Sequence, residues 1–172
     1  MPKDTLETIM KRRSIRTYKP EPIPDEELDL ILEAGRQSPS GGNRQPWHFV
    51  VVKDAELRKE VAAACNNQHW MANAAVILAA IGLPEKSPRW SVVDPTIAFQ
   101  TMILAAHSLG YGTCWIGAYD EAKVRQLLGI PQDVHLICLT PVGVPDAYPE
   151  ARPRNPRTEV FSLDRYGKPY PD

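Results

Sequence analysis

The pattern of apolar and polar positions along the chain predicts helices and strands that alternate around one sheet. Apolar residues with helical spacing predict helices that run from Asp4 toward Arg13, Asp25 to Ser38, Asp54 to about Cys65, Asp94 to Gly110, and Asp120 to Gly129. Runs rich in β-branched residues predict strands at 48–53, 113–116 and 134–144. Because the two kinds of element interleave, the fold class is α/β or α+β around a single sheet.

The segment 75–81 is apolar throughout, and its periodicity does not decide between a buried strand and a helix. We predict a strand, because Asn73 precedes the run and Gly82-Leu83-Pro84 follows it closely.

Several short polar residues mark the starts of the predicted helices. Asp4 with Glu7 resembles a capping box, and aspartates are expected to cap three later helices: Asp25, Asp54 and Asp120. The pair Asp94-Pro95 is expected to open the longest helix, with the proline at its first position.

Three segments carry information about packing. Leu6, Ile9 and Met10 form one apolar stripe on the first predicted helix, and Leu28, Ile31 and Leu32 form the buried face of the second. The 94–110 helix is apolar on nearly every side, which predicts burial all round and suggests a subunit interface. The chain has 17 prolines, and their density from Pro145 onward predicts an extended segment, with no regular helix, that runs across another surface.

Composition narrows the classes of partner and of site. A chain of 172 residues fits one domain, and a net charge of −1 gives no basic field for nucleic acid or an anionic membrane. The longest apolar run, 74–83, is about half the ~20 residues that a membrane helix needs, and the first residues lack a secretory signal. Three cysteines without a CxxC pair and four histidines without metal-ligand spacing predict no disulfide framework and no metal site. We therefore expect a protein of the reducing cytoplasm that binds no nucleic acid and no membrane.

Two arginine-rich segments are candidates for binding phosphate oxygens. The first contains Arg12, Arg13, Ser14 and Arg16, and the second is Arg152-Pro153-Arg154-Asn155-Pro156-Arg157. Guanidinium groups offer forked donors to phosphate, and fraying of the first helix near Arg13 lets Arg12, Ser14 and Arg16 point the same way. Each segment taken alone also fits a solvated basic surface.

Two glycine-rich segments are candidates for binding a flat ring. In 39–47 (PSGGNRQPW) the glycines let the backbone approach a ligand closely, and Asn43 and Gln45 each offer a donor and an acceptor. In 110–118 (GYGTCWIGA) Trp115 and Ile116 offer apolar surface, and Gly117 has an unencumbered N–H group. Neither segment is a GxGxxG fingerprint or a Walker loop, and each alone also fits an ordinary connection.

These four segments, in this order and with this spacing, resemble the FMN-dependent nitroreductase family over about residues 6–156. The resemblance implies an α+β fold, a three-layer α/β/α sandwich with a mixed, mainly antiparallel sheet. It also implies one domain over 1–172 that forms an intertwined homodimer, in which 145–172 is an extended segment that reaches the partner subunit.

The resemblance further implies a role for each matching position. Arg12, Arg13 and Ser14 would hold the FMN phosphate, together with Arg154 and Arg152. Arg16 would lie near the flavin's pyrimidine or ribityl oxygens, and it is the candidate to stabilise the anionic hydroquinone. The other cofactor-binding residues that the resemblance implies are Ser40, Asn43, Gln45, Cys114, Trp115, Ile116 and Gly117. Family sites sit between subunits, so some of these residues would serve the neighbour's flavin.

The activity implied is a transfer of reducing equivalents from NADH or NADPH, through bound FMN, to a small-molecule acceptor such as a nitro compound or a quinone. The mechanism would be ping-pong, with no side chain acting as nucleophile. A non-enzymatic FMN-binding or storage protein is an alternative, as are a dehalogenase or a flavin-fragmenting enzyme within the same fold. Iodotyrosine deiodinases share the RRS-x-R pattern but need a structured lid, whereas the connection 83–91 is short here. Trp70 and Trp90 are each either a cap over the substrate or a packed aromatic.

Overall fold

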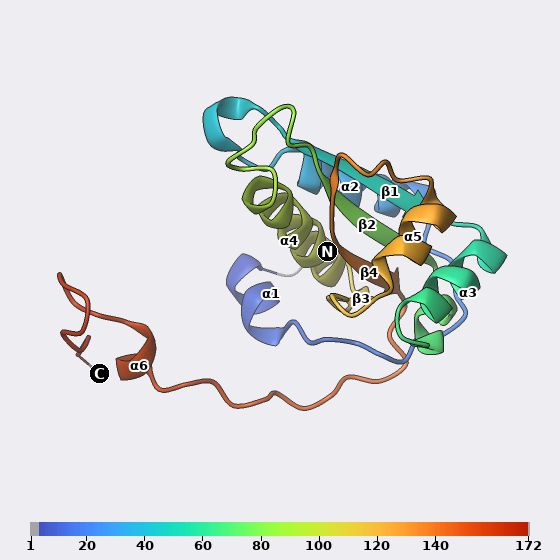
Figure 1. Cartoon of the computed structure of the whole chain (residues 1–172). Helices are drawn as coiled ribbons and strands as arrows, with labels where there is room; N and C mark the ends of the chain where they lie inside the picture. The colour runs from blue at the N-terminus through green and yellow to red at the C-terminus, as the bar shows by residue number, and fades with distance from the viewer. Residues whose placement is uncertain (1–3, 172) are drawn as a thin grey trace.

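The computed structural model describes residues 4–171, and its helices and strands follow one another in the interleaved order that the apolar pattern predicts (Figure 1). The α-helices are α1 (Thr5–Lys11), α2 (Asp25–Arg36), α3 (Ala55–Ala64), α4 (Val93–Ser108), α5 (Glu121–Leu128) and α6 (Arg157–Val160). The strands are β1 (Trp47–Val52), β2 (Val76–Gly82), β3 (Gly112–Thr113) and β4 (His135–Gly143). Two single-turn 3₁₀ helices are η1 (Gly41–Asn43) and η2 (His69–Asn73). The uncertain segment at 75–81 is therefore a strand, as predicted.

The strands form one sheet in the order β1-β2-β4-β3, and every neighbouring pair is antiparallel. Phe49 of β1 faces Ala80 of β2, and Ala79 of β2 faces Leu139 of β4. Within residues 4–171 the parallel pairing is an isolated bridge between Ser14 and Thr113. The sheet of a single chain is thus antiparallel rather than mixed, apart from that bridge.

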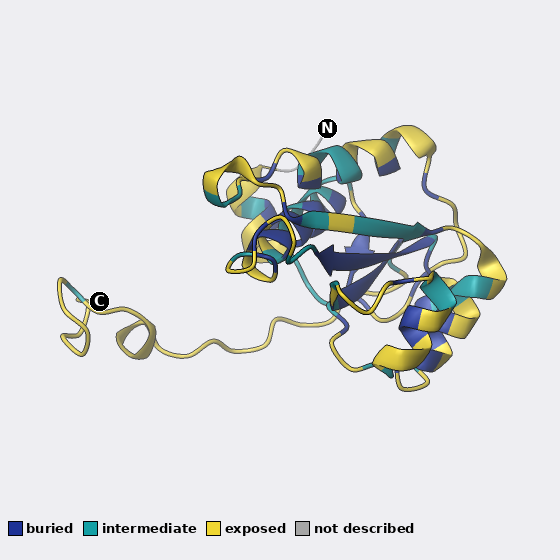
Figure 2. Cartoon of the chain, turned by 45° about the horizontal axis from the view of Figure 1, so that its top comes forward, coloured by how far each residue is buried: buried dark blue, intermediate teal, exposed yellow. Residues whose placement is uncertain are grey.

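The alternation of side chains along β2 divides the core into two layers. Ile77, Ala79 and Ile81 pack against α3 and α5, whereas Leu78 and Ala80 pack with α2 and α4 on the opposite face. Both faces of β2 are buried, which is why its sequence is an uninterrupted apolar run (Figure 2). The helices on both sides of the sheet confirm the predicted α/β/α sandwich.

Two predicted helix starts differ from the structure. Asp25 is the first residue of α2 rather than its cap, because the N-cap position is occupied by Pro24. The Asp25 carboxylate pairs with Lys53 Nζ at 2.5 Å. Helix α4 begins at Val93, so Pro95 lies inside the first turn, where N–H groups have no helical acceptor to lose. The expected caps Asp4, Asp54 and Asp120 do accept hydrogen bonds from the first turns of their helices.

The short strand predicted at 113–116 is confined to Gly112–Thr113. At the next residue the main-chain N–H of Cys114 donates to the side-chain hydroxyl of Thr140 at 3.1 Å instead of to a strand carbonyl. The chain leaves the ladder there and returns only as an isolated bridge between Ile116 and Leu139.

Apolar surface on α1 and α4 stays uncovered in the single chain. The stripe of α1 faces solvent, with Leu6 67% and Met10 73% exposed. The prediction that α4 is buried on all sides is wrong for one chain, because α2 and the sheet cover one face only and Val93 and Ile97 remain exposed. None of the helices in residues 4–171 is both long and apolar enough to span a bilayer.

The C-terminal segment leaves the body of the molecule after β4 and runs along its lower side in Figure 1. It is extended and almost entirely exposed from Tyr148 onward, as the proline density predicts (Figure 2). A single helical turn, α6, interrupts the extended run, and a bridge between Ser162 and Pro169 folds the end back on itself. Val160 and Phe161 are exposed there, so this end also presents apolar surface.

Candidate functional site

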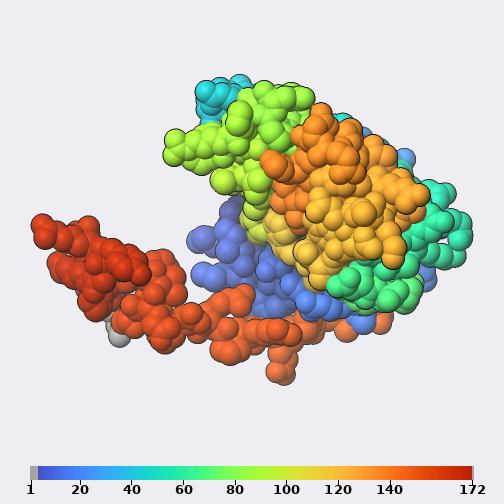
Figure 3. Space-filling model, in the orientation of Figure 1, coloured from blue at the N-terminus to red at the C-terminus, as the bar shows by residue number. Residues whose placement is uncertain are grey.

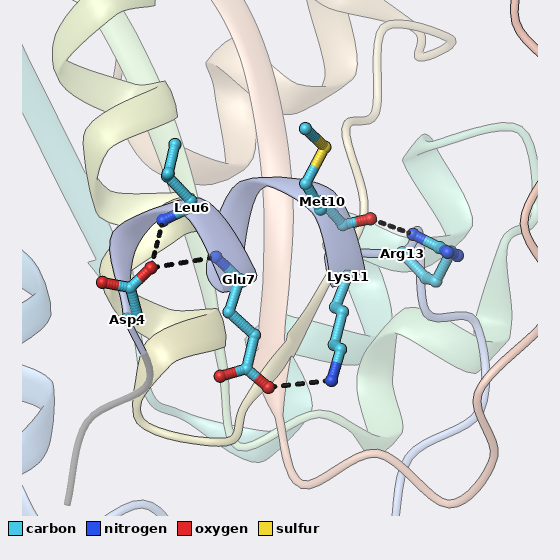
Figure 4. Close-up of polar contacts among 6 residues, drawn as sticks. All are labelled: Asp4, Leu6, Glu7, Met10, Lys11 and Arg13. Carbon is cyan, nitrogen blue, oxygen red and sulfur yellow. Dashed lines mark hydrogen bonds and ion pairs between the residues drawn. The ribbon is translucent and has the colours of Figure 1, made fainter.

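The end of α1 positions the first arginine segment. Asp4 caps the helix by accepting from the N–H groups of Leu6 and Glu7, and the helix ends at Lys11 (Figure 4). Arg13 Nη1 donates to the Met10 carbonyl at 2.9 Å, which ties the frayed end to the last turn.

Beyond the helix the chain is extended, and its side chains alternate between two sides. The backbone of Arg12 is extended rather than helical (φ −54°, ψ 135°). Further on, Ile15 N–H donates to the Thr113 carbonyl at 2.9 Å. Ile15 is buried in the core, whereas Ser14 and Arg16 on either side of it line a surface cavity. The predicted fraying is therefore confirmed, and it turns Arg12, Ser14 and Arg16 toward the same cavity.

The second arginine segment reaches this cavity because the chain after β4 pairs with the chain after α1. Lys19 N–H donates to the Val144 carbonyl and Asp146 N–H donates to the Thr17 carbonyl, both at 3.0 Å. This pairing directs the following residues back across the first segment. The resulting cavity, of about 160 Å³, is lined by Arg12, Arg13, Ser14, Arg16, Pro149, Glu150, Arg152 and Arg154.

The cavity, called here the arginine cavity, carries far more positive than negative charge. Five guanidinium groups line it, and Glu150 is the single carboxylate among the lining residues that the structure describes. Burial lowers the pKa of Arg12, and the charges of Arg154 and Arg13 lower it further. Since the arginines repel one another, the arrangement is complementary to a group with two negative charges, such as a phosphate monoester.

Cys114 lies beneath the arginine cavity. Burial raises the pKa of its thiol. The charge of Arg16, a hydrogen bond with Ser14 and the charge of Arg12 act in the opposite direction. Cys114 is 2% exposed. A neutral, packed thiol is the arrangement that this balance favours, rather than a reactive thiolate.

The rest of the 114–117 segment has its side chains in several environments. Trp115 donates from Nε1 to Gln100 Oε1 at 3.0 Å and packs edge-on against Phe99. Ile116 is buried in the core layer of α3 and α5, so only its backbone is available to a ligand near the surface. Gly117 is exposed.

A second cavity, of about 590 Å³, adjoins the arginine cavity and shares four of its arginines. Gln100 and Leu104 of α4 contribute to it, together with Ile9 and Met10 of α1. The sequence interpretation missed Gln100 and Glu150. Gln100 could have been recognised as a candidate, because it is an amide within a long apolar stretch. Glu150 lies among other polar residues, and the sequence does not distinguish it from them.

The loop 40–45 is organised by its own hydrogen bonds. Gln45 N–H donates to Ser40 Oγ at 3.0 Å, and Gln45 Nε2 donates to Asn43 Oδ1 at 3.2 Å. Gly42, Asn43 and Gln45 have positive φ angles of 58°, 54° and 50°. Such a loop is backbone-strained, which is a frequent property of ligand-binding segments.

Within a single chain, the loop 40–45 does not reach the arginine cavity. Gly41 N–H donates to Asp94 Oδ2 at 3.0 Å, which fixes the loop at the start of α4, a role of Asp94 that the sequence interpretation missed. The second cavity, which adjoins the arginine cavity, meets α4 at Gln100 and Leu104. At about 1.5 Å per helical residue, Asp94 and Leu104 are roughly 15 Å apart along the axis. Ser40, Asn43 and Gln45 therefore line neither of these cavities.

The two candidate capping tryptophans lie in different environments. Trp70 stacks on Tyr18, with ring centroids 6.3 Å apart, and packs against the buried core. Trp90 lies over Gly41 in the loop 40–45. Within residues 4–171 there is no group of three or more His, Cys, Asp or Glu side chains arranged to hold a metal ion.

Comparison with known proteins places this geometry in a family. The model of the nitroreductase family matches residues 9–68 and 62–144. The NADPH-flavin oxidoreductase of Vibrio harveyi is 33% identical over 179 residues, covering 95% of this chain and 75% of the relative. The FMN reductase [NAD(P)H] of Bacillus subtilis is 30% identical over 185 residues, covering 95% and 74%. The crystal structure of nitroreductase A from Vibrio parahaemolyticus superimposes with a TM-score of 0.88 at 32% identity, over 95% of this chain and 77% of that one. The chain thus belongs to the nitroreductase family.

Proposed function

We propose that the chain binds one FMN per active site and passes reducing equivalents from NADH or NADPH to a small acceptor, such as a nitro compound or a quinone. The observation that carries the proposal is the arginine cavity, in which segments from both ends of the chain bring five guanidinium groups together. The names of the Vibrio harveyi and Bacillus subtilis relatives, a flavin oxidoreductase and an FMN reductase, support the choice of cofactor and donor.

The phosphate of FMN fits the charge of the arginine cavity. Arg12, Arg13 and Ser14 would hold it from one side, and Arg152 and Arg154 from the C-terminal segment. Bound flavin supplies the hydride chemistry, so the protein needs no nucleophilic side chain.

Other residues would orient the ring and tune its chemistry. Arg16 would lie beside the ribityl chain or the pyrimidine edge, where its charge favours the reduced anionic flavin. Cys114, Trp115, Ile116 and Gly117 would cover one side of the ring, with Ile116 and Gly117 acting through the backbone.

A homodimer would complete the site. The exposed apolar surfaces of α1, α4 and the C-terminal segment border the open hollow seen at the left of Figure 3. A second copy placed there would bury them. It would also bring its own loop 40–45 toward the first copy's arginine cavity, so that Ser40, Asn43 and Gln45 serve the partner's flavin. In this arrangement 1–172 is one domain, 145–172 reaches the partner, and the two chains are intertwined.

Anaerobic reduction tests the function. The purified protein is expected to bind FMN, to lose its yellow colour on addition of NADH or NADPH, and to regain it when an acceptor is added. A ping-pong reaction gives parallel lines in double-reciprocal plots, because donor and acceptor use the same place in turn. We also propose that the enzyme works in the cytoplasm, where both NADH and NADPH are present.

Two outcomes would contradict the proposal. A yellow protein that neither donor bleaches would be an FMN-binding or storage protein rather than a reductase. A colourless protein that does not take up FMN would remove the cofactor assignment itself. Light scattering after size-exclusion chromatography tests the dimer separately: Met10→Glu together with Ile97→Glu should shift it toward monomer, because both side chains are exposed in one chain.

A further inference from the structure

The segment 83–92, between β2 and α4, is held rigidly beside the loop 40–45. Leu83 N–H donates to the Pro46 carbonyl at 3.0 Å, and Ser91 N–H donates to the Ser87 carbonyl at 2.9 Å. The Ser91 carbonyl oxygen lies so close to Gly82 that a Cβ there would be 1.7 Å away. Because Ser87 and Ser91 are buried, the segment presents its remaining side chains from a fixed backbone.

Trp90 connects this segment to the loop assigned above to the flavin ring. A Cβ on Gly41 would lie 3.0 Å from Trp90 Cδ1, so the indole packs directly on the glycine backbone. Gly41 is itself held by Asp94. Trp90 and the loop 40–45 therefore form one rigid unit at the start of α4. In Figure 1 the segments 40–45 and 83–92 lie at the upper left.

Arg89 is supported by this tryptophan. Its guanidinium carbon lies 5.1 Å from the centroid of the Trp90 ring, a cation–π contact that restrains the side chain. Arg89 is exposed, and none of the salt bridges among residues 4–171 includes it. A guanidinium held on its face by an aromatic ring keeps its N–H donors free at the edge, in a geometry that suits carboxylate or phosphate.

The surrounding charges favour an anion at this place. Arg44 is an exposed cation of the same unit, and its Nη1 donates to the Gly41 carbonyl at 2.9 Å. Glu85 is the exposed carboxylate of the segment, and Asp94 is buried.

We propose that Arg89, positioned by Trp90, binds an anionic group of the substrate. The group is a phosphate of the nicotinamide donor or a carboxylate of an aromatic acceptor, since both offer oxygen pairs to the guanidinium edge. The inference rests on the proposed function, because that function assigns the neighbouring loop 40–45 to the flavin ring. It adds to that function a residue that selects substrates by charge.

The test compares Arg89→Gln with Lys86→Gln, a matched removal of charge from the same segment. Anaerobic stopped-flow measures reduction of the FMN-loaded protein by NADPH, by NADH and by N-benzyl-1,4-dihydronicotinamide, which has no phosphate. Reoxidation is measured with 4-nitrobenzoate and with neutral 4-nitrobenzyl alcohol. Arg89→Gln should lower one of two rate constants about tenfold, equivalent to about 1.4 kcal/mol. These are the rate constant of reduction by NADH and NADPH, and the rate constant of reoxidation by 4-nitrobenzoate. Rates with the neutral partners should stay unchanged, and Lys86→Gln should have less than a quarter of the effect.

Substitution of Trp90 provides a second readout. Trp90→Leu should lose part of the same discrimination between anionic and neutral substrates, and Trp90→Phe should restore it, because an aromatic face supports the guanidinium. Equal losses for anionic and neutral substrates, or equal effects of Arg89→Gln and Lys86→Gln, would overturn the inference. A protein that takes up no FMN would overturn the proposed function along with it, whereas a yellow protein that is reduced normally and shows no charge discrimination would overturn the inference alone.

Discussion

Substitution of Arg154 by methionine should weaken FMN binding while leaving the apoprotein at least as stable as before. Arg154 lines the arginine cavity from the C-terminal segment, and its charge contributes to the lowered pKa of Arg12. In the absence of an anion the two arginines repel each other. Removal of one relieves that repulsion, and removes a donor only when phosphate is present.

The size of the effect follows from a charge-assisted hydrogen bond. Such a bond contributes roughly 1.5–3 kcal/mol, and we take the lower part of this range because Arg154 is exposed. The dissociation constant should then rise about 10- to 30-fold. With free FMN at about 100 times the wild-type dissociation constant, the ligand stabilises wild type by ~2.7 kcal/mol and a 30-fold weaker variant by ~0.9 kcal/mol. For a chain of this length that difference corresponds to a Tm roughly 4–7 °C lower in the presence of FMN.

The assay is a flavin-fluorescence titration of apoprotein, followed by thermal unfolding with and without FMN. Arg165→Met is the matched control, since Arg165 is an exposed arginine of the same C-terminal segment that does not line the cavity. An Arg154→Met protein that binds FMN as tightly as Arg165→Met would refute the assignment of this cavity to the phosphate. A loss of apoprotein stability would refute the repulsion argument.

Three further predictions concern single residues. Arg16→Ala should lower the two-electron reduction potential of bound flavin by on the order of tens of millivolts, as measured in an anaerobic redox titration, and an unchanged potential would exclude Arg16 from tuning the flavin. Burial and a hydrogen bond to Glu27 raise the pKa of Tyr111 to about 12. The contribution of the neutral phenol to the free energy of unfolding should be complete below pH ~10 and lost as the pH rises toward 12. In urea unfolding over that interval, Tyr111→Phe should therefore lose less free energy of unfolding than wild type. Gly82→Ala should lower the Tm strongly, because its Cβ would overlap the backbone oxygen of Ser91. An unaltered unfolding curve would show that the backbone of the segment 83–92 can move away from Gly82 at little cost in free energy.

Local patterns were sufficient to predict most of the fold. The apolar run at 75–81 fits a strand or a helix, and the residues that bound it, Asn73 and Gly82-Leu83-Pro84, correctly predict the strand β2. Asp54 and Asp120 cap helices where their positions before apolar runs suggest. Failures arose where tertiary contacts decided the outcome. Asp25 pairs with Lys53 across the chain instead of capping α2, and Cys114 turns its N–H group to a side chain of β4. No local pattern contains these partners.

The arginines that line the candidate cavity were predictable from the sequence, but their arrangement was not. Arg12 and Arg154 were each ambiguous in sequence, and their convergence depends on the pairing of the chain at 17–19 with the chain at 144–146. The loop 40–45 is kept away from that cavity by Asp94, which holds Gly41 at the start of α4, whereas the adjoining second cavity contacts α4 further along, at Gln100 and Leu104. The role of Asp94 as a support for Gly41 was hidden, because an aspartate at a helix start already has a sufficient local explanation.

Because the arginine cavity takes its walls from residues 12–16 and 149–154, it can form only after residues 149–154 have been synthesised and have folded against the first segment. A nascent chain on the ribosome, or one clipped by a protease before residue 149, keeps its four strands yet has half of the wall. If the cavity holds the FMN phosphate, as proposed above, FMN binding should need both segments, and a single cut before residue 149 should abolish it.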